Sequence, residues 1–480
     1  MGASFTTGLI VGNDTIALAV LLVRFDASVP AATLPAVRIA ALTASALAAV
    51  LAVAGAQAKG QAQRTAAQST DVVVDLQAKR QVIQGFGTSS RVWTDPHLAN
   101  AADVDVPTEA QTQILTSLYR RLGLTRVRNV LDNGLQQRPG APLSFEGKRA
   151  DGHIAFVKQA RRFGLTTFFP GPVYLEDWMR PENPSAYVDW AMAMLQRWRV
   201  QGLEPALYAP LNEPQIARDF PPQWMHDVVI QLGKRLRAAG FKTKLVIPDD
   251  ENPTDAYRRA VAVLDDPNAR QYVAALAYHV YRWDTSEGRP AIVKMRQLAS
   301  QHKLPVWMTE YSTSGYKDWR SSFEWAERMH VLLTDGGVNA IDYMWGYFGD
   351  WVRTDTLISI DFDHGVYRGH SPTPLYWLTG QYSRFVRPGF VRVSATGSRG
   401  TVLTSAYRSP NRAIVVATNP SSTTQTVRIA VTGGKLKGLV RPVRSSPTEQ
   451  WRSLPPMAPR GGRFTVKLPP QSVTTYSAAR

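Results

Sequence analysis

Short apolar runs alternate with amphipathic helical patterns about eight times between Asp71 and Pro388. The runs are rich in β-branched and aromatic residues and are bounded by turn residues, as strands are. Eight strand-then-helix units over roughly 300 residues have the order and length of a (β/α)8 TIM barrel. We therefore expect an α/β fold with a barrel over residues 82–388, whose strands cover residues 84–89, 126–130, 166–169, 207–211, 244–248, 273–281, 305–310 and 340–347.

Two of the predicted helices have clear starting signals. Thr108 and Gln111 have the spacing of a capping box, and Asn183-Pro184 supplies an N-cap residue followed by a first-turn proline.

A doubly wound open sheet is the alternative arrangement for such an alternation. The first predicted strand is not followed by Gly-x-Gly-x-x-Gly, and the sequence has no phosphate loop ending in Gly-Lys-Ser/Thr. Nucleotide chemistry therefore has no support in the sequence.

The hydrophobic period changes to two after Gly389. Short alternating runs separated by Gly, Pro, Asn and Ser predict an all-β sandwich domain over residues 389–480. A single strand within residues 71–81 precedes the barrel, and we expect it to pair with this sandwich.

Positive charge is concentrated in the predicted sandwich. The chain has 55 Lys and Arg against 38 Asp and Glu, a net charge of +17. From Gly389 onward 14 Lys and Arg face one acid, Glu449, which leaves a surplus of 13 in this domain. The surplus is either a solvated surface or a face that contacts an anionic glycan or a cell surface. The sequence has no nucleic-acid recognition motif, so no nucleic-acid partner is expected.

The sequence of the N-terminal region, residues 1–58, indicates a targeting segment rather than a folded domain. Ile39 to Ala58 carries no charge and ends in Ala56-Gln57-Ala58, a small-x-small cleavage pattern, so we expect a secreted, periplasmic or cell-surface protein. An uncleaved membrane anchor is the alternative. The hypothesis for Met1 to Ala36 is an upstream extension, with translation starting near Val37. Residues 59–70 are predicted to form a polar linker.

Two glutamates end predicted strands. Glu213 follows the fourth strand, and Glu310 ends the seventh. In a barrel these strand ends lie on opposite sides of one mouth, where catalytic residues stand. Acetal cleavage needs such a pair, because one carboxyl protonates the departing oxygen while the other stabilises or attacks the anomeric carbon.

The sequence resembles glycoside hydrolase family 30, in the clan of retaining (β/α)8 glycosidases. The resemblance runs from about Val72 to the C-terminus, and family members have a β-sandwich after the barrel. Its motifs are Gln84-Gly-Phe-Gly87, Leu211-Asn-Glu-Pro214, His279-Val-Tyr281, Thr309-Glu-Tyr-Ser312 and the stretch from Tyr376 to Gly389.

The resemblance implies a role for each matching residue. Glu213 would be the acid/base and Glu310 the nucleophile. Asn212 would hydrogen-bond the sugar 2-hydroxyl, Tyr281 would lie beside the nucleophile, and Trp345 would form the floor of the adjacent subsite.

Further residues are expected around the substrate. We expect His279 to be a substrate-binding residue. Asp132 is either a hydrogen-bond acceptor for a sugar hydroxyl or a helix cap. The family commonly has Ser-Pro-Trp after the third strand, where this chain has Gly171-Pro-Val173, so Trp178 is the candidate to replace the missing tryptophan. Tryptophans stack on the apolar face of a pyranose or pack in the core, and the candidates at loop positions are Trp93, Trp178, Trp283 and Trp351.

The sequence thus predicts an exported, retaining O-glycosyl hydrolase acting on β-linked glycans or glycosides such as xylan or β-1,6-glucan. Retention requires the two carboxyl groups to lie roughly 5–5.5 Å apart. No cofactor or metal is expected, since the eight histidines are scattered and cysteine is absent. A monomer is expected. The alternative is a non-catalytic carbohydrate- or envelope-binding protein on the same scaffold.

Overall fold

The computed structural model describes residues 70–89, 91–130, 136, 138–144, 148–172, 175–281, 288–316, 318–350, 355–397 and 402–480. The predicted leader (1–58), nearly all of the predicted linker (59–70), Asp132, Trp283 and Trp351 lie outside these residues. Within them, no helix has the length and apolar character needed to cross a membrane.

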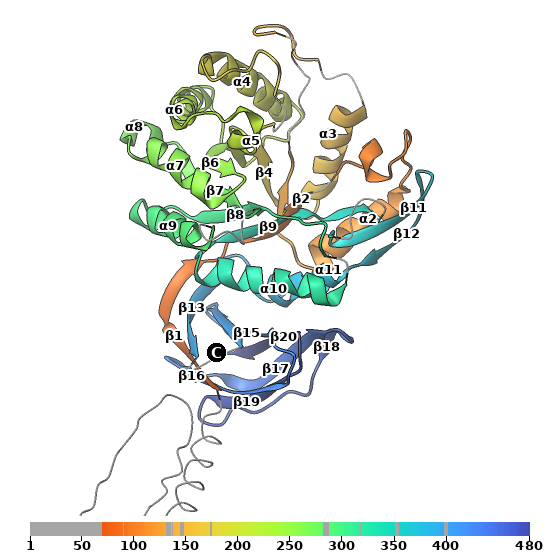
Figure 1. The fold of residues 1–480 in the computed structure, drawn as a ribbon, viewed down its shortest axis with the longest axis vertical. Coiled ribbons are helices and arrows are strands. Elements are labelled where there is room, and N and C mark those ends of the chain that lie inside the picture. The colour runs from red at the N-terminus through yellow and green to blue at the C-terminus, as the bar shows by residue number, and fades with distance from the viewer. Residues whose placement is uncertain are drawn as a thin grey trace, which may run out of the picture. The chain divides into compact units, whose positions relative to one another are not determined.

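Eight parallel strands form a closed barrel, in which the last strand, β9, pairs with the first, β2 (Figure 1). The predicted barrel is confirmed, and the open sheet is excluded. The strands are β2 (Gly85–Ser89), β3 (Arg126–Arg128), β4 (Thr166–Pro170), β5 (Leu207–Ala209), β6 (Lys244–Asp250), β7 (Val273–His279), β8 (Val306–Glu310) and β9 (Ala340–Trp345).

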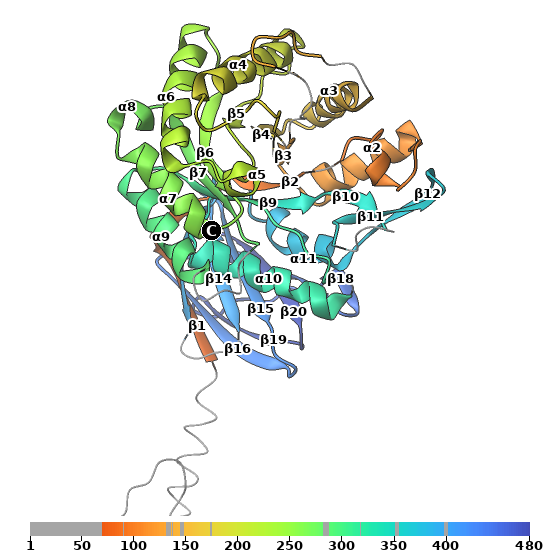
Figure 2. The same cartoon turned by 45° about the horizontal axis from the view of Figure 1, so that its top comes forward.

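Helices surround the barrel because each strand is followed by a segment with one apolar face (Figure 2). Asn183 caps α4 by accepting a hydrogen bond from the Ala186 backbone, as predicted. The capping box at Thr108 is wrong: Pro107 is the N-cap, and the Gln111 side chain bonds Val106 instead. The helices are η1 (Pro96–Leu98), α2 (Thr108–Thr116), η2 (Ser117–Arg121), α3 (Lys148–Arg161), α4 (Pro184–Val200), α5 (Pro214–Arg218), α6 (Pro222–Ala238), α7 (Pro253–Leu264), α8 (Pro267–Arg270), α9 (Gly288–Gln301), α10 (Trp319–Thr334) and α11 (Pro374–Ser383).

A buried ion pair lies inside the barrel near the start of the strands. Arg126 of β3 donates to Asp342 of β9 at 2.8 Å, and both side chains are buried. Gly87 of β2 leaves room for this pair, because a Cβ at that position would stand 2.2 Å from the Asp342 carboxylate. Residues two apart on a strand face the same side, so Arg128 also points into the barrel, at its opposite end.

A nine-stranded sheet forms the second domain, with the order β18-β17-β20-β15-β14-β13-β1-β16-β19. Strand β1 precedes the barrel in sequence but pairs with β13 and β16 of this sheet. Apolar residues from both halves of the sheet, including Val74, Val415, Phe464 and Tyr476, share one core, as in a sandwich. The strands are β1 (Thr70–Val82), β13 (Val391–Gly397), β14 (Leu403–Arg408), β15 (Arg412–Asn419), β16 (Gln425–Thr432), β17 (Lys437–Ser446), β18 (Glu449–Ser453), β19 (Arg463–Leu468) and β20 (Ser472–Ala479).

Helix α11 joins the barrel to the sandwich. The buried Gln381 side chain donates to Ser445 of β17 and accepts from Thr475 of β20. A small sheet of β10 (Tyr347–Gly349), β11 (Ile358–Asp363) and β12 (Val366–Pro372) lies between β9 and α11 in the chain. The β11–β12 hairpin turns at His364 and Gly365.

Candidate active site

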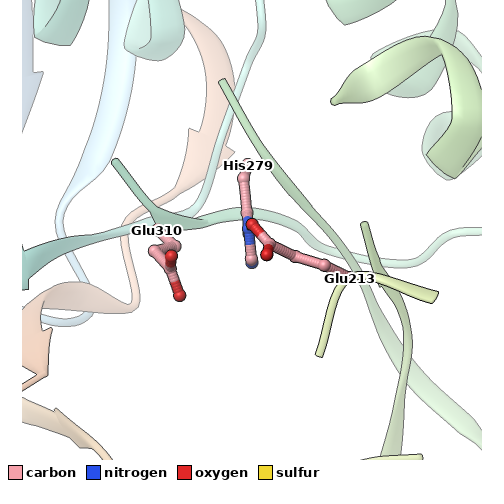
Figure 3. A group of neighbouring side chains, drawn as sticks. All are labelled: Glu213, His279 and Glu310. Carbon is pink, nitrogen blue, oxygen red and sulfur yellow. The ribbon is translucent and has the colours of Figure 1, made fainter. Parts of the chain in front are cut away.

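Two carboxylates and an imidazole meet at the C-terminal ends of the barrel strands. Glu310 and His279 are the last residues of β8 and β7, and Glu213 lies just beyond β5. One atom from each of the three side chains lies within 4.8 Å of the others, and the Glu213 carboxyl reaches toward the imidazole and Glu310 (Figure 3). The nearest oxygens of the two carboxyl groups therefore lie within 4.8 Å of each other, which fits the roughly 5–5.5 Å separation of retaining glycosidases better than the roughly 6.5–9.5 Å of inverting ones.

The backbone at Glu213 is strained in a way that aims its side chain. Glu213 has φ 54°, in the left-handed region that residues other than glycine rarely adopt. Its N–H donates to the Asp249 carbonyl at 2.9 Å, and Pro214 starts α5 at the next residue. This sharp turn between a strand and a helix holds Glu213 at the barrel mouth, a pattern common at functional sites.

His279 holds the Glu213 carboxyl through a hydrogen bond. The buried imidazole contacts Glu213 through Nδ1 and Oε1 at 2.8 Å. Burial raises the pKa of the Glu213 carboxyl above its ordinary value, and the negative charge of Glu310 raises it further against the lowering effect of His279. Burial alone would lower the pKa of His279, but the carboxylates of Glu310, Asp249 and Glu213 outweigh it and raise that pKa to about 10.

Glu310 is held by two donors, one on each oxygen. Arg128 donates to Oε2 at 2.5 Å, and the Tyr281 hydroxyl donates to Oε1 at 2.7 Å. Both contacts stabilise a negatively charged carboxylate. Burial and the neighbouring Glu310 charge raise the pKa of Tyr281 well above its ordinary value, so the hydroxyl keeps the proton that it donates.

Arg128 and Asp249 complete a buried network that the sequence analysis missed. Arg128 also donates to the Asn212 side chain and to Asp249 at 3.2 Å. Thr309 donates to the other Asp249 oxygen at 2.5 Å. Burial would raise the pKa of Asp249, but the Arg128 charge, His279 and the Thr309 hydrogen bond together outweigh burial and hold that pKa at about 2. Two features of the sequence could have indicated this network. One is the pair of arginines two residues apart within a predicted strand, and the other is the run of acidic residues directly after a different predicted strand.

The structure thus brings five predicted residues into one cluster: Glu213, Glu310, Asn212, His279 and Tyr281. Asn212 shares the Arg128 guanidinium with Glu310, which fixes its amide beside the carboxylate.

Two predicted tryptophans lie at the same end of the barrel. Trp345 ends β9, packs edge to face with Phe348 at 4.8 Å and lies under the Arg91 guanidinium. Trp178 lies in the loop after β4 and packs against the core, with its indole N–H donating to the Gln136 carbonyl at 2.8 Å.

Trp93 packs in the core rather than presenting a free face. Its ring stacks on Tyr347 with centroids 4.1 Å apart, and its indole N–H donates to Gln159. Of the two roles considered for Trp93, stacking on a sugar or packing in the core, the structure therefore shows packing in the core.

The close approach at Gly171 gives a physical reason for one departure from the family pattern. A Cβ at Gly171 would stand 2.1 Å from the Pro210 carbonyl oxygen, which lies just before Asn212. The serine common in the family would therefore collide with the segment that carries Glu213.

Glu213, His279 and Glu310 also have the spacing of metal ligands. However, the Arg128 guanidinium already places a positive charge 2.5 Å from Glu310. The raised pKa keeps His279 protonated, so its ring nitrogens lack the lone pair that a metal needs. These charges favour proton chemistry over metal binding.

The C-terminal domain matches a known family. Residues 389–476 match the family model described as the glycosyl hydrolase family 30 beta sandwich domain. The chain is 23% identical to "Glucuronoxylanase XynC" of Bacillus subtilis (strain 168) over 432 residues, which are 86% of this chain and 92% of that relative. It is 24% identical to "Lysosomal acid glucosylceramidase" of Mus musculus over 278 residues, 53% of this chain and 51% of that protein.

A solved structure shows the same architecture. The glycoside hydrolase family 30 subfamily 8 xylanase Xyn30A from Clostridium acetobutylicum superposes with a TM-score of 0.69 at 24% identity, covering 85% of this chain and all of that one. Fold, site and relatives define an enzyme of the glycoside hydrolase class. The resemblance to glycoside hydrolase family 30 that was predicted from the sequence is confirmed.

Proposed function

We propose that this enzyme cleaves β-linked glycans with retention of anomeric configuration, using Glu310 as nucleophile and Glu213 as acid/base. The observation that carries the proposal is the short separation of the two carboxyl groups, within 4.8 Å at their nearest ligand atoms. The different environments of the two groups support this division of roles, because burial raises the pKa of Glu213 while Arg128 and Tyr281 donate hydrogen bonds to the two oxygens of Glu310.

The first step forms a glycosyl-enzyme. The Glu310 carboxylate attacks the anomeric carbon, the bond from that carbon to the glycosidic oxygen breaks, and Glu213 gives its proton to the departing oxygen. Tyr281 and Arg128 hold the Glu310 oxygens in position for the attack. Asn212, held by Arg128, is placed to hydrogen-bond a sugar hydroxyl next to the reacting carbon.

The second step restores the enzyme. Glu213, now a carboxylate, removes a proton from water as the water oxygen attacks the anomeric carbon, and the ester bond to Glu310 breaks. The negative charge of Glu310 contributes to the raised pKa of Glu213, and that charge is absent while Glu310 is esterified. The pKa of Glu213 therefore falls when the residue must act as a base, and rises again when Glu310 is released.

Xylan bearing glucuronate is the substrate that we propose first, with β-1,6-glucan and β-glucosides as the next candidates. The relative with the longest aligned segment reported above is named a glucuronoxylanase, and the mouse relative is named a glucosylceramidase. β-1,6-Glucan is the further candidate from the sequence analysis.

The test is hydrolysis of a panel of these glycans by the purified chain, followed by proton NMR of the first product. Release of the β-anomer before mutarotation supports the proposal, and release of the α-anomer contradicts retention. Binding of a glycan without any cleavage across the panel would favour the non-catalytic alternative.

We also propose that the protein is exported, as the uncharged segment from Ile39 to Ala58 suggests. N-terminal sequencing of the protein recovered outside the cytoplasm tests this proposal, with cleavage after Ala58 as the expected result. The expectation of a monomer stays a prediction, which light scattering of the purified chain would check.

A further inference from the structure

We infer that a groove between the barrel and the sandwich binds a carboxylated saccharide at a second site, separate from the catalytic cluster. The groove has a volume of about 470 Å³ and is lined by Arg120, Arg121, Gly123, Arg384, Arg387 and Trp451. Gly123 lies just before β3, at the N-terminal end of the barrel strands, whereas Glu310 ends β8. The two sites are therefore at opposite ends of the barrel.

Four arginines converge on this groove without an acidic partner. Among the described residues, no carboxylate lies within 4 Å of their guanidinium groups, although ion pairs within that distance are frequent elsewhere. Glu449, the single acid after Gly389, is already paired with Arg444 and Arg452. Like charges gathered in this way repel each other unless an anion joins them.

Two of the arginines are fixed before any ligand binds. Arg384 lies over the Trp451 ring at 4.0 Å, and Arg387 donates to the carbonyls of Gly123 and Ser383. Burial lowers the pKa of both arginines, and no carboxylate raises either value. Arg120 is also held by packing, over the Phe163 ring at 5.4 Å, but none of these contacts neutralises the positive charge gathered in the groove.

Trp451 is itself held rigidly, and it fixes the Arg384 guanidinium at the groove. Its backbone has φ 48°, a left-handed conformation that is rare for an aromatic residue. This conformation directs the ring over Gly380, where a Cβ would stand 2.1 Å from the indole. The indole N–H is fixed to the Trp377 carbonyl at 2.8 Å.

Guanidinium forks match a glycan that carries carboxylates, which are those of uronate sugars. Trp451 holds the Arg384 guanidinium in place, and a guanidinium binds a carboxylate through two parallel hydrogen bonds. The groove volume lies within the usual range of ligand sites, about 300–1,000 Å³. The spread of four arginines around it suits a short run of uronate residues rather than a single anion.

The test is a binding titration of the full chain with polygalacturonate, whose α-linkages are not those of the proposed substrate. Arg121 and Arg384 are replaced together by Gln, and the matched control is Arg412→Gln with Arg441→Gln, which removes two exposed charges from another basic groove of the sandwich. We expect the groove variant to weaken binding by about tenfold or more, as lost charge-assisted hydrogen bonds imply, and the control by less than about twofold. Hydrolysis of a small neutral substrate should be unchanged in both.

Three results would overturn the inference. Equal loss of binding in both variants would mean that the charge of the sandwich acts diffusely. Unchanged binding in the groove variant would remove the arginines from the site. Equal or tighter binding of dextran sulfate, or of fully methyl-esterified polygalacturonate, would show that a carboxylated sugar is not what the groove recognises. None of these results depends on whether Glu310 is a nucleophile, so the two proposals fail separately.

Discussion

Replacing Arg128 by Met should destabilise the barrel by an amount that follows from its contacts. Arg128 is fully buried and contacts Glu310 at 2.5 Å and Asp249 at 3.2 Å. Its loss leaves the Asp249 carboxylate, which is also fully buried, without its strongest partner. Breaking a buried ion pair in this way costs about 3–5 kcal/mol. With an m-value of about 3 kcal/mol per M, the urea midpoint should fall by about 1–1.7 M.

Arg126→Met is the matched control for this experiment. Arg126 lies on the same strand and forms a buried ion pair with Asp342, so its loss should lower the urea midpoint to a similar extent. It lies at the other end of the barrel, so under conditions where both variants are folded it should retain glycan hydrolysis, while Arg128→Met should not. The assay is urea unfolding followed by tryptophan fluorescence, with activity measured on the folded fraction.

The pH dependence of the stability loss shows whether Arg128→Met destabilises the protein through the unpaired Asp249 charge or only through lost packing. The Asp249 pKa is lowered to about 2 in the folded protein, so its contribution to stability is present above its ordinary value of 3.8 and is lost as pH falls toward 2. Without Arg128 the Asp249 carboxyl protonates at higher pH, so the penalty should be smaller at pH 4 than at pH 7. Adding Asp249→Asn should restore part of the stability at pH 7. A loss below about 1 kcal/mol, or an equal loss at both pH values, would refute this reasoning.

Three further predictions address the catalytic cluster. Tyr281→Phe removes the 2.7 Å hydrogen bond to Glu310 and should lower kcat/KM by about 10- to 100-fold with little change in Tm; an unchanged rate would free Tyr281 from this role. Glu213→Gln should lower kcat by about 10²–10⁴-fold on glycans with poor leaving groups, as loss of general acid catalysis does, and near-normal turnover would exclude Glu213 as the acid. The pKa of His279 is raised from 6.5 to about 10, so its contribution to stability is complete below pH 6.5 and is lost as pH rises through 10. The urea midpoint of the unsubstituted protein should therefore fall over this pH range by more than the midpoint of His279→Gln. Identical dependence of the two midpoints on pH would contradict this prediction.

The local pattern of the sequence was sufficient to predict the barrel and the close approach of Glu213 and Glu310. Strand β8 has all five of its residues buried, and Glu310 stands at its end, where a parallel strand opens to the mouth. The carboxylate pair followed from topology alone, because strands β5 and β8 bring their ends together wherever a barrel closes.

Arg128 and Asp249 could not be predicted in the same way. An arginine within a strand usually indicates a solvent-exposed face, and β3 reads Arg-Val-Arg with all three residues buried. The side of the barrel that these arginines face depends on partners more than a hundred residues away, Asp249 and Asp342. Similarly, Trp93 became a core residue because Tyr347 stacks on it, a contact that no local pattern contains.

The measurement that tests the central claim most directly is mass spectrometry of the enzyme after reaction with an activated 2-deoxy-2-fluoro glycoside of the cleaved sugar. The fluorine slows the second step more than the first, so a retaining enzyme accumulates the glycosyl ester. We predict a single covalent adduct on the peptide that carries Glu310, and no adduct in Glu310→Gln. An adduct on a different residue, or turnover by inversion with no adduct, would contradict the account.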